Sequence, residues 1–218
     1  MVNRMLMVLA MLQLLSCNVD SEVNGSRVDR LPFYQEATFT PLWMEAGVAP
    51  PDTFHRIGPF ELLNQEGETV TEQTFAGKIY VADFFFTVCP GICPKMTDNM
   101  KLLQDEFLDD DEVLLLSHSV TPKYDSVPVL KRYAEEKEIV SRKWHLVTGD
   151  QQAIYKLGRH DYFVEESLGL KKGEDDFLHT ENFVLVDKHR YIRGIYNGLN
   201  KTSVNQLIAD IRTLKYEE

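Results

Sequence analysis

Hydrophobic and polar positions follow two periods along the chain, and these periods predict strands and helices in alternation. Residues 78–87 (KIYVADFFFT) and 112–120 (EVLLLSHSV) are nearly continuous apolar runs, typical of strands buried on both faces. Residues 143–149 (KWHLVTG) predict a third strand. Residues 57–71 (IGPFELLNQEGETVT) predict an additional N-terminal hairpin with its turn at 64–67.

Helical spacing follows the first buried run. Apolar residues recur at Met96, Met100, Leu103 and Phe107, which predicts an amphipathic helix over 94–107 and assigns its two methionines to core packing.

Three further helices and a second hairpin complete the expected order. The helices are expected over 126–139, over 150–160 with Asp150 as N-cap, and over 201–217; the hairpin is expected across Lys188 and His189. This order predicts an α/β, three-layer fold with a mixed central sheet.

The first residues have a composition different from that of the domain. A basic start at Arg4 precedes an apolar run over 5–15, too short to span a bilayer and typical of a signal peptide. The run ends in Leu-Leu-Ser-Cys, which resembles a bacterial lipobox with Cys17 as the lipidated residue. We therefore expect a lipoprotein signal peptide at 1–17, a tether and N-terminal arm at 18–50, and the domain at 51–218. The protein would be anchored in a membrane by lipid, facing the periplasm or cell exterior.

The length and net charge of the chain limit its class and its partners. A length of 218 residues fits one α/β domain plus a tail. A net charge of −11 argues against a nucleic-acid partner. With Cys17 assigned to lipid, the domain contains two cysteines, Cys89 and Cys93, in the stretch FFFTVCPGICPKM.

Cys89 and Cys93 lie in a predicted strand-to-helix turn, and each precedes a proline. A helix N-terminus favours thiolate, which is both the nucleophile of disulfide exchange and a soft metal ligand. An extracytoplasmic pair at this spacing is therefore either a labile disulfide or part of a metal site. The spacing alone does not distinguish them.

Whether a histidine can join the two cysteines bears on the choice between a disulfide and a metal site. Structural zinc normally needs four ligands, whereas two thiolates and one imidazole suit a cuprous ion. Of the six histidines, His179 immediately precedes a predicted strand, where a loop could reach the cysteine turn. We expect His118 and His145, in or beside strands, to be structural residues with satisfied ring nitrogens.

The sequence resembles the SCO/SenC family of thioredoxin-like copper proteins over residues 54–214. The resemblance rests on ADFFFTVCPGICPKM, LLLSHSVTPKYDSVPVLKRYAE, WHLVTGDQQAI and LHTENFVLVDKHRYIRGIY. It implies a thioredoxin-like fold and one copper ion bound by Cys89, Cys93 and His179, with Cys89 and Cys93 also able to form a redox-active disulfide. Two positions depart from the family pattern: Leu178 and Thr121 stand where aspartate is usual.

The family resemblance implies a membrane-anchored chaperone, not an enzyme, that delivers copper or prepares thiols for the dinuclear copper site of cytochrome c oxidase. Its partner would be the copper-bearing subunit of the oxidase or another copper protein, and the chain would be a monomer. The alternative is an extracytoplasmic thiol–disulfide oxidoreductase that uses Cys89 and Cys93 as catalytic thiols. A peroxidase ranks last because the turn carries two Cys-Pro pairs. Replacement of His179 separates the first two hypotheses.

Overall fold

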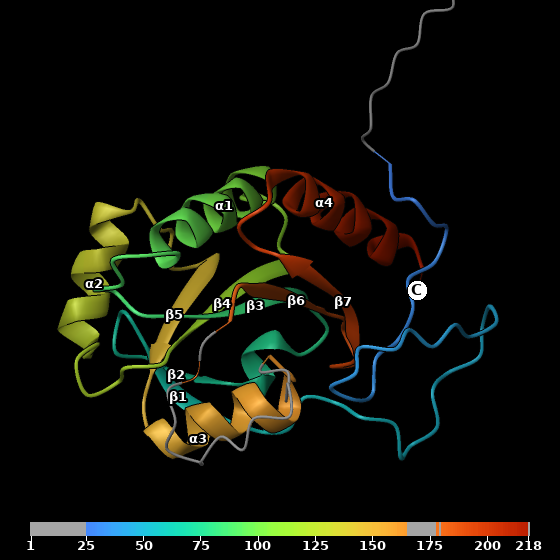
Figure 1. Cartoon of the computed structure of the whole chain (residues 1–218), viewed down its shortest axis with the longest axis horizontal. Helices are drawn as coiled ribbons and strands as arrows, with labels where there is room; N and C mark the ends of the chain where they lie inside the picture. Colours follow the sequence, from blue (N-terminus) through green and yellow to red (C-terminus); the bar gives the residue numbers. More distant parts are fainter. Residues whose placement is uncertain (1–24, 165–177, 179, 218) are drawn as a thin grey trace, which may run out of the picture.

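The computed structural model describes residues 25–164, 178 and 180–217. A mixed seven-stranded sheet lies between two layers of helices (Figure 1). The strands are β1 Glu61–Asn64, β2 Thr69–Thr71, β3 Ile79–Phe85, β4 Val113–Ser119, β5 Trp144–Thr148, β6 Asn182–Val186 and β7 Ile192–Asn197. Their order across the sheet is β2-β1-β5-β4-β3-β6-β7.

The three central strands β3, β4 and β5 are parallel, and β1 and β6 join them in the antiparallel direction. Phe85 at the end of β3 is paired with Ser119 at the end of β4. The loops that leave these two strands therefore begin side by side. One of these loops carries Cys89 and leads directly to Cys93, the first residue of α1.

The helices are α1 Cys93–Glu106, α2 Val127–Glu136, α3 Gln151–Lys156 and α4 Lys201–Tyr216, with a 3-10 helix at Glu72–Phe75 and a π-helix at Leu157–Asp161. The predicted elements are present, and the Asp150 side chain caps α3 by accepting from the amide of Ala153. The helix expected over 150–160 changes geometry at Leu157, where the π-helix begins. Gly158, within that π-helix, lies close to the ring of Phe84, so the wider turn accompanies a close approach to β3.

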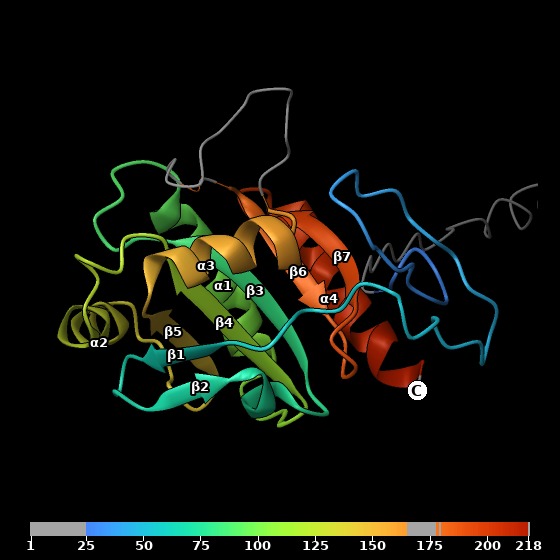
Figure 2. The same ribbon diagram turned by 90° about the horizontal axis from the view of Figure 1, so that it is seen from below.

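Two apolar clusters fill the spaces on the two faces of the sheet. Side chains of α1, α2 and α4 pack on one face, and α3 and the π-helix pack on the other (Figures 1 and 2). Met96 and Met100 are fully buried in the first cluster, as their helical spacing predicts. This arrangement confirms the expected three-layer α/β fold with a mixed sheet and an N-terminal hairpin.

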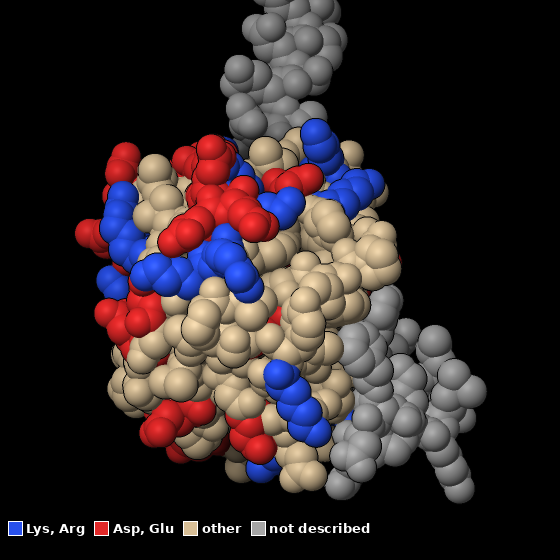
Figure 3. All heavy atoms as spheres, turned by 90° about the vertical axis from the view of Figure 1, so that its left-hand side faces the viewer, with Lys and Arg blue, Asp and Glu red and all other residues tan. Residues whose placement is uncertain are grey.

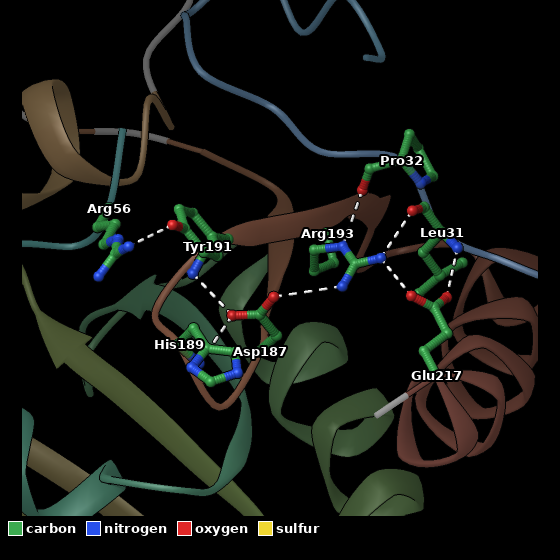
Figure 4. A network of polar contacts seen from close by, with 8 residues as sticks. All are labelled: Leu31, Pro32, Arg56, Asp187, His189, Tyr191, Arg193 and Glu217. Atoms are coloured by element: carbon green, nitrogen blue, oxygen red, sulfur yellow. Dashed lines mark hydrogen bonds and ion pairs between the residues drawn. The ribbon is translucent and has the colours of Figure 1, made fainter. Parts of the chain in front are cut away.

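The N-terminal arm is fastened to the end of the chain through Arg193 in β7 (Figure 4). Its guanidinium donates to the carbonyls of Leu31 and Pro32 and forms ion pairs with Asp187 and Glu217. Arg193 is 4% exposed, so a buried cation fixes the arm against β7 and the C-terminal turn. We call these residues the Arg193 network.

Candidate metal centre

The turn over residues 86–92 connects β3 to α1 and places Cys93 at the first position of the helix. Cys93 is buried and Cys89 is half-buried. The N-cap residue Ile92 gives no side-chain hydrogen bond to the helix. The first backbone amides of α1 therefore need another acceptor, and Cys89 supplies one.

The Cys89 sulfur accepts hydrogen bonds from the backbone amides of Gly91, Ile92 and Cys93, and the two thiols are hydrogen-bonded to each other. Burial alone raises the pKa of Cys89, but these hydrogen bonds outweigh it, so the pKa lies below its usual value. Burial and the hydrogen bond with Cys89 raise the pKa of Cys93 well above its usual value. The pair therefore has one thiol disposed to ionise and one disposed to keep its proton.

Both cysteines are free thiols in this structure, and the disulfide between them stays a prediction. Two adjacent sulfurs fit part of a site for a soft metal ion. Within residues 25–164, 178 and 180–217, no three His, Cys, Asp or Glu side chains converge on a metal position. His179 and Cys17, both predicted from the sequence, lie outside the described residues.

The residues on either side of His179 are anchored in the domain. Leu178 is 1% exposed and shares an apolar cluster with Phe84, five residues before Cys89. Thr180 is also buried, and its hydroxyl accepts from the amide of Asn182 at the start of β6. Leucine instead of the family's aspartate at 178 fits this apolar position, where a carboxylate would be costly to bury.

The cysteine turn is accessible from the side of the molecule that carries α2. Figure 3 shows this side: acidic and basic side chains mix in its upper part, and uncharged side chains fill its middle. Two apolar residues are exposed here: Val88, next to Cys89 in the chain, at 53%, and Tyr124, next to Asp125, at 57%. Lys95 in the first turn of α1 and Lys123 beside Tyr124 are exposed as well, so a partner approaching Cys89 would meet both apolar and basic side chains.

Two buried carboxylates near the turn were not singled out from the sequence. Asp125 accepts hydrogen bonds from Thr87, Ser119 and Thr121, so the hydroxyl at 121 replaces the family's aspartate with a donor. Asp83, in β3, accepts from the Ser117 hydroxyl. Asp125 reads in the sequence as an ordinary solvated acid of a loop. Asp83 stands inside the apolar run over 78–87, and this position itself indicates burial.

The expectation for His118 was wrong in one respect. Its ring is fully buried and stacks on Phe84 at 4.6 Å between ring centroids, and Nδ1 lies 3.3 Å from the carbonyl of Asp83. Its Nε2, however, has no hydrogen-bond partner. Aromatic side chains surround the ring, and none of them forms a hydrogen bond with the second nitrogen.

Asp83 and His118 give opposite pH dependences of stability. Burial raises the pKa of Asp83 to about 7 and lowers the pKa of His118 to about 4. In the unfolded chain the pKa of the Asp83 carboxyl is near 3.8, so between about pH 4 and 7 the folded state binds the proton more tightly than the unfolded state does. The free energy of unfolding therefore falls as pH rises from about 4 to 7. For His118 the unfolded chain binds the proton first, so stability falls as pH drops from 6.5 to about 4.

Between pH 4 and 6.5 the two effects oppose each other, and single variants should separate them. The Asp83→Asn variant keeps only the His118 effect, so its free energy of unfolding should fall by roughly 3 kcal/mol when pH is lowered from 6.5 to 4. The His118→Phe variant keeps only the Asp83 effect, so its free energy of unfolding should fall by roughly 3 kcal/mol when pH is raised from 4 to 6.5. Urea unfolding at intervals of half a pH unit measures the slopes; identical slopes in both variants and the parent would contradict the assignment.

The fold and the turn together define a class: a thioredoxin-like domain with a paired-thiol turn between a buried strand and the first helix of the sheet. The SCO1/SenC family model matches residues 48–215. The chain therefore belongs to the SCO1/SenC family.

The relatives agree with this assignment. A SCO1 protein homolog of Bacillus subtilis is 31% identical over 164 residues, which cover 73% of this chain and 82% of the relative. A SCO1/SenC family lipoprotein of Bacillus anthracis has a solved structure with a TM-score of 0.64 and 28% identity, covering 74% of this chain and 95% of the other.

Two other solved structures bear on disulfide and copper chemistry in the family. BsSco, a member of the Sco family of cytochrome c oxidase assembly proteins in which a disulfide switch was identified, matches with a TM-score of 0.60 and 28% identity over 74% of this chain and 94% of its own. ScoI of Bradyrhizobium japonicum, solved with copper bound, matches with a TM-score of 0.57 and 26% identity over 72% of this chain and 98% of its own. The prediction of copper is thus confirmed at the level of the family.

In the part of the chain that the structure describes, no helix is both long enough and apolar enough to cross a bilayer.

Proposed function

We propose that this chain is a membrane-anchored copper-binding protein that delivers copper, or prepares thiols, for assembly of the dinuclear copper site of cytochrome c oxidase. Cys89, Cys93 and His179 hold the copper ion, and Cys17 carries the lipid. The observation that carries the proposal is the pair of hydrogen-bonded thiols at the start of α1 in a chain of the SCO1/SenC family. Two soft sulfurs and one imidazole form a ligand set suited to a cuprous ion.

Three observations support the individual assignments. Cys89 is half-buried, so a metal can enter and leave without unfolding of the domain. Leu178, next to His179, is buried with Phe84 at the end of the strand that leads to Cys89. The likeness to a Bacillus anthracis lipoprotein supports lipid attachment at Cys17 on the outer side of a membrane. The partner is the copper-bearing subunit of the oxidase or another copper protein, and the chain acts as a monomer.

The His179→Ala variant tests the metal site. We expect its affinity for cuprous ion to fall by more than the roughly 10–100-fold that loss of an outer-sphere partner costs, because a direct ligand is removed. Competition against a chromophoric cuprous chelator measures the affinity of the reduced protein. His189→Ala, at the exposed hairpin turn, is the matched control. Equal affinity in the His179→Ala variant and the control would remove His179 from the site.

The unequal thiols favour one second candidate, a thiol–disulfide oxidoreductase. The lowered pKa of Cys89 suits an attacking thiolate, and the buried Cys93 suits the resolving thiol. Exchange with glutathione disulfide should then persist in the His179→Ala variant. A parent protein that retains no copper but exchanges rapidly would favour this second function over the first.

A further inference from the structure

The two thiols depend on the turn over residues 86–92 for their relative position, and Phe86, Cys89 and Ile92 of this turn pack against the core cluster of α1. Cys89 donates a backbone hydrogen bond to Phe86 at 3.3 Å, and α1 begins without a side-chain cap. Pro90 and Gly91 follow Cys89 in the turn, and both are exposed. The amides of Gly91, Ile92 and Cys93 hold the Cys89 sulfur at one end of the turn. The first residues of the turn fix its other end through contacts of their own.

Thr87, two residues before Cys89, is held by a carboxylate from another loop. Its hydroxyl donates to Asp125 Oδ1 at 2.5 Å, and its backbone amide lies 3.3 Å from Asp125 Oδ2. Both the side chain and the main chain of Thr87 are thereby bound to the same group. Hydrogen bonds to a charged acceptor are about twice as strong as neutral ones.

Asp125 is itself held firmly. It is fully buried, and its Oδ2 also accepts from the hydroxyls of Ser119 at 2.6 Å and Thr121 at 3.0 Å. The backbone amide of Asp125 donates to the carbonyl of Thr121, which closes the loop between β4 and α2. Among the described residues no lysine or arginine forms an ion pair with Asp125, so hydroxyl and amide donors stabilise its charge.

We propose that Asp125 is the positioning residue of the paired-thiol site. It fixes Thr87, and through Thr87 it holds Cys89 in a single orientation next to Cys93, so that both sulfurs are arranged before a metal binds. The register of the sheet makes this coupling direct, because Phe85 and Ser119 are paired at the ends of β3 and β4. The inference rests on the proposed function for its copper measurement, but the thiol pair itself allows an independent one.

The experiment uses the full chain in detergent, reduced and free of oxygen. Asp125→Ala is expected to lower affinity for cuprous ion about 10–100-fold, the usual cost of losing an outer-sphere partner. Thr87→Val, which keeps the backbone amide and the shape of the side chain, should produce a smaller loss in the same direction. The double variant should bind no more weakly than Asp125→Ala alone, because both changes break one connection.

Asp210→Ala is the matched control for a merely structural effect. Asp210 is also a buried carboxylate, and it accepts from Ser26, Tyr196 and Gln206. Its removal should destabilise the fold and leave copper affinity unchanged. Equal affinity losses in Asp125→Ala and Asp210→Ala, or an unchanged affinity in Asp125→Ala, would overturn the inference. Should Asp125→Ala fail to fold, the milder Thr87→Val is compared with Asp210→Ala and decides alone.

Equilibration with glutathione separates this inference from the proposed function. If the parent protein binds no copper, the proposed function fails, and the thiol–disulfide equilibrium then tests the positioning role. Thiols held less firmly close a disulfide less readily, so Asp125→Ala should shift the equilibrium about tenfold toward the dithiol, which equals about 30 mV. Asp210→Ala should produce no shift. An unshifted equilibrium in Asp125→Ala would count against the positioning role.

Discussion

Replacing Cys93 with serine is expected to lower the affinity of the reduced chain for cuprous ion by about 10²–10⁴-fold, the range by which a second linked contact strengthens binding. Cys93 opens α1 beside Cys89, so in the proposed site the two sulfurs would act as one bidentate group. Serine offers a neutral hydroxyl, which is a poor ligand for a soft ion. Competition with a cuprous chelator, at matched thiol reduction, measures the loss.

Met96→Leu is the control for this experiment. Met96 lies one turn further along α1 and is fully buried in the core, so a change of its sulfur to carbon should leave copper affinity as in the parent. A parallel loss in Met96→Leu would show that the thioether also binds metal. Retention of full affinity by Cys93→Ser would contradict a two-sulfur site.

Replacing Arg193 with alanine is expected to reduce the free energy of unfolding by about 3–5 kcal/mol, the usual cost of removing one partner from a buried ion pair. Arg193 forms ion pairs with both Asp187 and Glu217 (Figure 4). Its guanidinium carbon also lies 3.9 Å from the ring centroid of Phe33. Without the guanidinium, both carboxylates remain buried and lose their cation. Urea unfolding at pH 7 measures the change.

Arg212→Ala is the control for position. Arg212 pairs with Glu106 on the surface, where both side chains are more than a third exposed, so its loss should cost at most about 1 kcal/mol. The Arg193→Lys variant keeps the charge and loses the planar guanidinium fork, so its free energy of unfolding should lie between those of Arg193→Ala and Arg212→Ala. If Arg193→Ala unfolded at the same urea concentration as Arg212→Ala, the Arg193 network would have no special role in stability.

The fold was largely predictable because its signals are local. Buried central strands read as continuous apolar runs, and α1 shows its spacing from Met96 to Phe107. The π-helix at Leu157–Asp161 was not predictable from local signals: it lies close to Phe84, a residue of β3 more than seventy positions earlier in the chain. The pairing of Arg193 with Glu217 was likewise invisible, because both residues read as ordinary surface charges in the sequence.

The candidate site also has residues that could be predicted from the sequence and residues that could not. Cys89 and Cys93 could be found from spacing and prolines, and the start of α1 at Cys93 follows from that pattern. Asp125 could not be found, because its role depends on the register that brings the ends of β3 and β4 together. The free Nε2 of His118 is also a property of its surroundings, since a histidine in a strand gives no sign of which nitrogen lacks a partner.

The Arg193 network fixes where the N-terminal arm leaves the domain. The arm emerges beside the end of α4, whereas the green turn at residues 86–92 lies on the other side of the molecule, near α2 (Figures 1 and 2). A chain anchored at its N-terminus would thus carry its two cysteines on the side of the domain opposite the point of attachment. If the proposed lipid anchor and copper delivery hold, an acceptor in the same membrane would have to extend outward to the height of the domain, or the domain would have to reorient on its tether before copper is transferred.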